Sequence, residues 1–112
     1  SKPLMLTGGF KTRAQAEDVL RSGVVDVIGL ARALVIEPNL PSLWMKDQMP
    51  EPTFPRFAQA PEGGVTAWYT MRLTDIGADQ ETDETGDLLE AMRAYDKRDG
   101  ERTEIWTQHF RR

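Results

Sequence analysis

The feature that most constrains this chain is a pair of short apolar runs, each of which ends at glycine. Leu4–Thr7 stops at Gly8 and Gly9, and Val24–Ile28 stops at Gly29. Glycine-bounded runs of this length are typical of buried strands, because helices need about ten or more residues. The second run is β-branched and mostly apolar, a pattern typical of strands buried on both faces in parallel sheets.

The residues between these runs carry the start and stop signals of a helix. Thr12 and Gln15 form a capping-box pattern, in which the hydroxyl and the amide side chain can each satisfy a free backbone N–H. Gly23 stands where a left-handed helix end is expected. The apolar stripe between them consists of Ala16, Val19 and Leu20. Strand, helix and strand together predict a compact βαβ unit with a right-handed crossover.

The rest of the chain predicts four further helical segments around an irregular stretch. A short helix over 30–36 should end before Pro38, and another over 40–45 should bury Leu43 and Trp44. Residues 48–64 are rich in Pro, Gly and Gln and predict a linker. The helix over 65–76 and the helix capped by Asp87 complete the set. Beyond them, the apolar residues that need a partner surface are Ile105, Trp106 and Phe110.

Composition narrows the function classes. The 112 residues include no Cys, which excludes disulfides, thiolate metal ligands and a cysteine nucleophile. The net charge is −4, and we expect no nucleic-acid partner because such proteins need a basic face. No apolar run approaches the roughly 20 residues that span a bilayer, so we expect no membrane partner and a cytoplasmic protein. The negative excess lies wholly in residues 50–112.

The two strand ends form the candidate binding site. In parallel α/β sheets, ligands bind beyond the carboxyl ends of the strands. Glycine lets backbone N–H groups approach an anion, which favours Gly8 and Gly9 as phosphate donors. Ala31 adds a backbone N–H, and Arg32 adds a guanidinium that can grip two phosphate oxygens. An ordinary turn and a solvated arginine explain the same residues, and spacing alone leaves both interpretations open.

A resemblance favours the phosphate site. The segments that carry it are Leu4-Met5-Leu6-Thr7-Gly8-Gly9-Phe10, Ala16-Glu17-Asp18-Val19-Leu20, Val25-Asp26-Val27-Ile28-Gly29-Leu30-Ala31-Arg32-Ala33-Leu34 and Pro38-Asn39-Leu40-Pro41. In order and spacing, residues 3–44 resemble the C-terminal part of the old yellow enzyme family, FMN-dependent (β/α)8 barrels that oxidise NADH. The resemblance implies an α/β fold in which residues 1–47 are the last two βα units of a TIM barrel. Residues 65–112 would be a helical C-terminal extension beyond the 48–64 linker.

The resemblance also implies a cofactor and its contacts. In the family, amides after the seventh strand and a Gly-Arg step after the eighth hold the FMN phosphate. These roles pass to Gly8 and Gly9, and to Ala31 and Arg32, although Ala31 replaces the usual glycine. The family's substrate-binding His pair or His/Asn pair and its proton-donating Tyr come from earlier strands, so no catalytic residue is expected here. We expect an inactive fragment of an NAD(P)H oxidoreductase, completed by the rest of the barrel or by self-association.

Two other functions remain open, namely another phosphate-binding TIM-barrel enzyme and a non-enzymatic interaction module. Single residues favour structural roles: His109 should be solvated, and Asp26 should bond to a neighbouring amide. In the acidic stretch 75–87, the segment Asp79-Gln80-Glu81-Thr82-Asp83 lacks the loop glycine and closing Glu of an EF-hand, and no metal site is expected. The aromatic residues expected in core or partner contacts are Trp44, Trp68, Tyr69 and Trp106.

Overall fold

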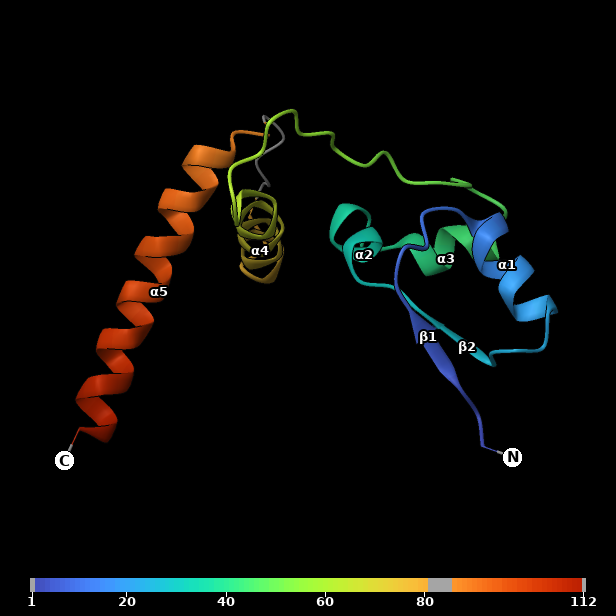
Figure 1. Cartoon of the computed structure of the whole chain (residues 1–112), viewed down its shortest axis with the longest axis horizontal. Coiled ribbons are helices and arrows are strands. Elements are labelled where there is room, and N and C mark those ends of the chain that lie inside the picture. The colour runs from blue at the N-terminus through green and yellow to red at the C-terminus, as the bar shows by residue number, and fades with distance from the viewer. Residues whose placement is uncertain (1, 81–85, 112) are drawn as a thin grey trace. The chain divides into compact units, whose positions relative to one another are not determined.

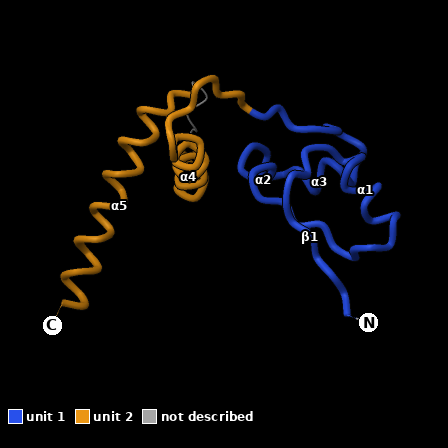
Figure 2. Tube along the Cα trace, viewed as in Figure 1, with its two compact units in different colours: residues 1–54 blue, residues 55–112 orange. Residues whose placement is uncertain are grey.

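The computed structural model describes residues 2–80 and 86–111. It divides into two compact units, residues 1–54 and residues 55–112, which Figure 2 shows in separate colours. Within the described residues, unit 1 contains two strands and three helices, and unit 2 contains two helices. None of the described helices is both long and apolar enough to cross a lipid bilayer.

Unit 1 is built on a two-stranded parallel sheet. Strand β1 covers Met5–Thr7 and strand β2 covers Val27–Gly29, with Met5 opposite Val27 and Thr7 opposite Gly29 (Figure 1). The predicted βαβ unit is confirmed, with strands shorter than the apolar runs. Asp26 extends the pairing, because its N–H donates to the Leu4 carbonyl at 2.9 Å and its carboxylate accepts from the Leu4 N–H at 2.9 Å. The predicted structural role of Asp26 is therefore confirmed.

Helix α1, Arg13–Arg21, joins the two strands and has the predicted ends. The Thr12 hydroxyl accepts from the Gln15 N–H at 3.1 Å, and the Gln15 side chain accepts from the Thr12 N–H at 3.1 Å. Both bonds satisfy donors that the first helical turn leaves without partners. After the helix, Gly23 takes the left-handed conformation with φ 75°. The capping-box prediction is correct in every bond.

Helices α2, Arg32–Ile36, and α3, Leu40–Met45, correct the sequence predictions in detail. Helix α2 begins two residues later than expected, because the chain is still turning away from the strand at Ala31, where φ is −119° and ψ is −82°. In α3 the fully buried side chain is Leu40, whereas Leu43 and Trp44 are only half-buried. The Trp44 indole stays near the surface, since its Nε1–H donates to the Met49 carbonyl at 2.9 Å.

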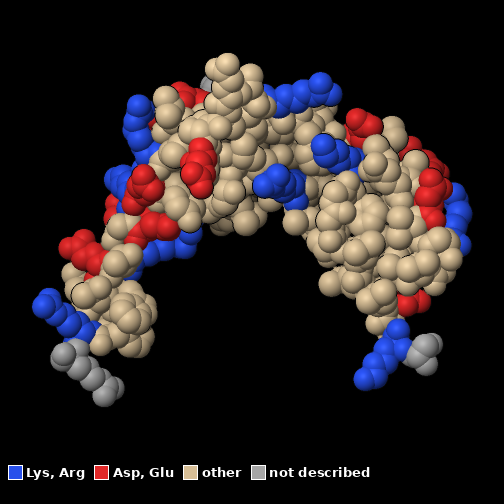
Figure 3. Space-filling view, viewed as in Figure 1, with Lys and Arg blue, Asp and Glu red and all other residues tan. Residues whose placement is uncertain are grey.

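The strands of unit 1 are not buried on both faces, so that expectation is wrong for this chain. Met5 is 62% exposed and Val27 is 48% exposed. The physical reason is that the described helices of this unit, α1 among them, lie on one face of the two-stranded sheet and leave the face of Met5 and Val27 open. The small core consists of Ala16, Val25, Ala33, Leu40 and Pro52. Figure 3 shows that the visible face of this unit is mostly uncharged.

Unit 2 is a pair of helices, α4 (Gly64–Gly77) and α5 (Leu88–Phe110), that pack on each other. Its core is aromatic. Trp68 is 4% exposed, and its ring meets Phe57 at 5.4 Å and Tyr69 at 5.0 Å between centroids, both edge to face. The small buried residues that let the helices approach include Ala67 and Ala91.

Helix α5 begins at the predicted cap and is one continuous helix. The Asp87 carboxylate accepts from the Glu90 N–H at 3.0 Å. At the other end, Trp106 is 63% exposed and its ring stacks against Phe110 at 5.2 Å between centroids. Ile105 is exposed as well. Charged side chains of both signs are interspersed along α5 (Figure 3), which is typical of a solvated helix.

Candidate functional site

The register of the sheet brings the four candidate residues to one edge. Because Thr7 lies opposite Gly29 in a parallel pair, both strands end at the same level. Gly8 and Gly9 continue from β1 at that edge, and Ala31 and Arg32 follow β2 after one intervening residue, Leu30. The carboxyl edge of a parallel sheet is where α/β proteins bind ligands. The sequence prediction that two separate loops share one edge is thus supported by the geometry of the strands.

Gly8 and Gly9 have backbone conformations that favour glycine. Their φ angles are 137° and 72°, values that a side chain disfavours. Apart from their chain neighbours, no described residue has an atom within 4 Å of the position that a Cβ atom would take at either glycine. Both residues are exposed. The glycines are therefore required by the turn rather than by crowding, and the space beside their amides is open to a ligand.

Ala31 and Arg32 stand at the start of α2. Ala31 provides no side-chain cap for this helix, so its first-turn amides receive no bond from the capping residue. Both residues are exposed, so the Ala31 methyl group points into no crowded space. Arg32 is the first residue of the helix, at the same edge as the two glycines.

The structure adds Gly29 and Thr7, which sequence reasoning did not include in the site. A Cβ atom at Gly29 would lie 1.9 Å from Thr7 Oγ1 and 3.0 Å from Thr7 Cβ. The Thr7 side chain therefore occupies the space that a side chain at Gly29 would need. Only a weak signal in the sequence, a glycine after a β-branched run, points to this pair, because the proximity of the two residues depends on the strand register.

A groove of about 340 Å³ lies on the helix-covered side of β2, within unit 1. Its lining is mainly apolar, and the residues that form it include Ala16, Leu20, Ile28, Leu30 and Trp44. At its edge, Arg13 pairs with Glu17 at 2.8 Å and with Asp47. The hydrogen bonds that Arg13 donates to Asp47 and, with a smaller effect, to Glu17 raise the pKa of Arg13 above its ordinary value. Through these bonds Arg13 links the loop after α3 to α1.

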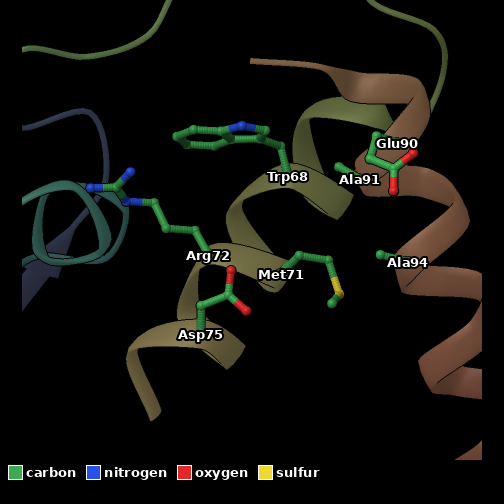
Figure 4. Close-up of a pocket in the computed structure, with 7 residues that line it drawn as sticks. All are labelled: Trp68, Met71, Arg72, Asp75, Glu90, Ala91 and Ala94. Atoms are coloured by element: carbon green, nitrogen blue, oxygen red, sulfur yellow. The ribbon is translucent and has the colours of Figure 1, made fainter. Parts of the chain in front are cut away.

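A smaller cavity of about 150 Å³ lies between α4 and α5 in unit 2 (Figure 4). Met71 points from α4 toward Ala91 and Ala94, whereas Arg72 extends to the other side of α4. The Arg72 guanidinium lies 5.5 Å from the centroid of the Trp68 ring. Cofactor pockets usually measure about 300–1,000 Å³. This cavity is therefore a packing gap beside the aromatic core.

The other residues considered as metal-binding or catalytic candidates form no such site within residues 2–80 and 86–111. No group of three or more His, Asp or Glu side chains in these ranges could hold a metal ion. His109 is exposed, with its ring 6.4 Å from that of Phe110, which agrees with the predicted solvated role. Part of the considered calcium loop, residues 81–83, lies outside the described residues.

The two parallel strands are joined by a helix and end in glycine at the same edge, and the carboxyl edge of such sheets is where α/β proteins bind ligands. Comparison with known proteins points to a class. The chain is 49% identical over 39 residues to the NADH-dependent flavin oxidoreductase iccE of Talaromyces variabilis. It is 33% identical over 70 residues to the NADH-dependent flavin oxidoreductase iliE of Neonectria sp. (strain DH2).

These matches cover 35% and 62% of this chain, and each covers 9% of the relative. The chain thus spans about a tenth of the length of the curated relatives that it matches. No family model and no solved structure matches it. Over part of its length, the chain is similar to NADH-dependent flavin oxidoreductases, and that part of the sequence prediction is supported.

Proposed function

We propose that this chain is the C-terminal part of an FMN-dependent NAD(P)H oxidoreductase of the old yellow enzyme family, and that it forms the corner that holds the FMN phosphate. The observation that carries the proposal is the register of the sheet, which places both glycine-ended strands at one edge. The partial similarity to two NADH-dependent flavin oxidoreductases agrees with it.

In this proposal, β1, α1, β2 and α2 are the last two βα units of a (β/α)8 barrel. Three features support the assignment. The strands are parallel and joined by a helix, as in a barrel wall. Met5 and Val27 leave apolar surface uncovered, which neighbouring strands and an interior layer of side chains would bury in a closed barrel. The chain also corresponds to a small fraction of its longer relatives.

The residues of the proposed phosphate site would bind the phosphate in two ways, through backbone N–H groups and through the Arg32 side chain. The N–H groups of Gly8, Gly9 and Ala31 would donate to phosphate oxygens, because the backbone there is exposed and free of side-chain obstruction at both glycines. The Arg32 guanidinium would balance the phosphate charge with two parallel hydrogen bonds. FMN, when bound, would supply hydride transfer from NAD(P)H to an acceptor. This chain would anchor the cofactor, and the reacting groups would come from the rest of the enzyme.

The direct test is a titration of FMN at fixed low concentration with increasing protein, followed by flavin fluorescence anisotropy. We expect a dissociation constant on the order of 1 mM, because the chain contacts only one end of the cofactor. Arg32→Ala should weaken binding by about tenfold, the value of a charge-assisted hydrogen bond. Arg21→Ala removes another exposed arginine of unit 1, which pairs with Glu17 and Asp18, and should leave binding unchanged.

Two results would contradict the proposal. Nanomolar binding of FMN by this chain alone would show that it is not a fragment of the site. Equal binding of FMN and of riboflavin, which lacks the phosphate, would show that the phosphate is not what the chain recognises.

A further inference from the structure

Thr7 and Gly29 form a pair at the carboxyl edge of the sheet. They lie opposite each other in the parallel register. The Thr7 hydroxyl occupies the volume beside Gly29 that a side chain would fill, since a Cβ there would be only 1.9 Å from Oγ1. Glycine at position 29 therefore sets the orientation of the Thr7 side chain. Any larger residue would push the hydroxyl away from β2.

The pair lies on the face of the sheet that the helices leave open. Side chains alternate between the two faces of a strand, and paired residues share a face. Ile28 lines the groove formed with α1 and α3, so its face is the helix-covered one. Thr7 and Gly29 therefore lie on the opposite face, together with exposed Met5 and Val27. In the proposed barrel that face is the interior, toward which a cofactor would extend.

The Thr7 hydroxyl is available to a ligand. The side chain is exposed, and its hydroxyl makes no hydrogen bond with any residue in the ranges 2–80 and 86–111. A hydroxyl can both donate and accept one or more hydrogen bonds. It stands one residue before the Gly8 amide along β1, about 3.3 Å in strand rise. The Thr7 hydroxyl thus lies next to the proposed phosphate donors, on the sheet face that would be the interior of the proposed barrel.

We infer that Thr7 is a further ligand-binding residue, whose hydroxyl contacts the polyol chain attached to the phosphate rather than the phosphate itself. Gly29 is its positioning residue. This inference rests on the proposed function, because it needs a phosphate on the amides of Gly8 and Gly9. The chemical class that fits is a phosphorylated sugar alcohol, with a hydroxyl group close to its phosphate. The ribityl chain of FMN has this chemistry.

The test compares two ligands by ¹⁵N and methyl NMR titration of the whole chain. FMN carries the polyol and inorganic phosphate does not. Thr7→Val keeps the shape and removes the hydroxyl, and it should weaken FMN binding by about three- to tenfold, the range for one neutral hydrogen bond. Phosphate binding should not change. Thr7→Ser keeps the hydroxyl and should retain most of the FMN affinity.

Two more variants test the positioning role. Gly29→Ala should reproduce the loss seen in Thr7→Val, and the double variant should lose no more, because both changes remove the same contact. Val27→Thr places a hydroxyl on the same face one pleat lower and should not restore binding to Thr7→Val. The amide spectrum of Gly29→Ala would show whether this variant still folds. If it does not, the difference in FMN affinity between Thr7→Val and Thr7→Ser tests the role of the hydroxyl by itself.

Three other outcomes would contradict the role of Thr7, and they show whether the proposed function fails as well. Unchanged FMN affinity in Thr7→Val would show that the hydroxyl contacts no ligand, while the phosphate corner stands. Equal losses for FMN and phosphate would assign the hydroxyl to the phosphate. If neither ligand shifts the amides of Gly8 and Gly9 in the unsubstituted chain, the proposed function fails and the role of Thr7 fails with it.

Discussion

The two units of this chain are held together by different means. Unit 2 buries Trp68 against Phe57 and Tyr69 between two helices, so a large aromatic side chain forms its centre. Unit 1 buries mainly small side chains and leaves strand residues such as Met5 exposed. Aromatic side chains bury about 150–250 Å² each and dominate core energetics. Unit 2 thus has a core of its own, whereas unit 1 depends on local hydrogen bonds.

The local bonds of unit 1 also place its candidate site. The Thr12 capping box fixes the start of α1, and the Asp26 bonds to Leu4 fix the pairing of the strands. These bonds set where β1 and β2 end, and so where the glycine loops emerge. The unit with the open sheet is the one that carries the proposed phosphate site. In the proposed barrel, neighbouring strands would cover this sheet.

The largest effect is expected from the core of unit 2. Trp68→Ala removes a buried aromatic ring and its edge-to-face contacts, and should lower the free energy of unfolding of unit 2 by about 3–5 kcal/mol. Trp106→Ala removes an exposed ring and should cost far less. Thermal unfolding followed by circular dichroism measures both. Similar losses for the two variants would show that Trp68 is not the centre of this unit.

The open sheet of unit 1 should promote self-association. Exposed apolar strands with free edges pair readily with other strands. We expect light scattering to show concentration-dependent dimers, and Val27→Lys to weaken that association by about tenfold, near 1.4 kcal/mol. Leu89→Lys changes an exposed residue of unit 2 and serves as the matched control. A strictly monomeric chain with a bare sheet would contradict this expectation.

The smallest effect concerns the start of α1. Thr12→Ala should destabilise unit 1 by about 1 kcal/mol, since the Gln15 N–H loses its acceptor. Thr12→Ser keeps the hydroxyl and should cost only a few tenths of that value. Amide hydrogen exchange of residues in α1 reports the difference. Unchanged protection in Thr12→Ala would mean that the cap does not control the unit.

Local signals in the sequence predicted much of the fold. The capping box at Thr12, the cap at Asp87 and the left-handed turn at Gly23 each need only neighbouring residues, and all three are correct. The order of strand and helix followed from glycine-bounded apolar runs. Burial was harder to predict. Val27 belongs to an apolar run that predicts a buried strand, yet it is half exposed because the described helices leave its face of the two-stranded sheet open.

The sequence predicted the two turn glycines of the candidate site but not the proximity of Thr7 to Gly29. Gly8 and Gly9 are predictable as turn residues by type and position, because few other residues tolerate their φ angles. The relation between Thr7 and Gly29 depends on a register between residues 22 positions apart in the chain. No local pattern specifies that register. It follows from pairing, including the bonds between Leu4 and Asp26, which only the structure shows.

The most direct test of the phosphate corner is a ¹⁵N NMR titration of the whole chain with inorganic phosphate at constant ionic strength. We predict that the amides of Gly8, Gly9, Ala31 and Arg32 shift along one saturation curve, with a dissociation constant on the order of 1 mM. Arg32→Ala should weaken this binding by about tenfold. If these amides do not respond, or if the shifts concentrate in α4 and α5 instead, the strand ends of unit 1 are not a phosphate site.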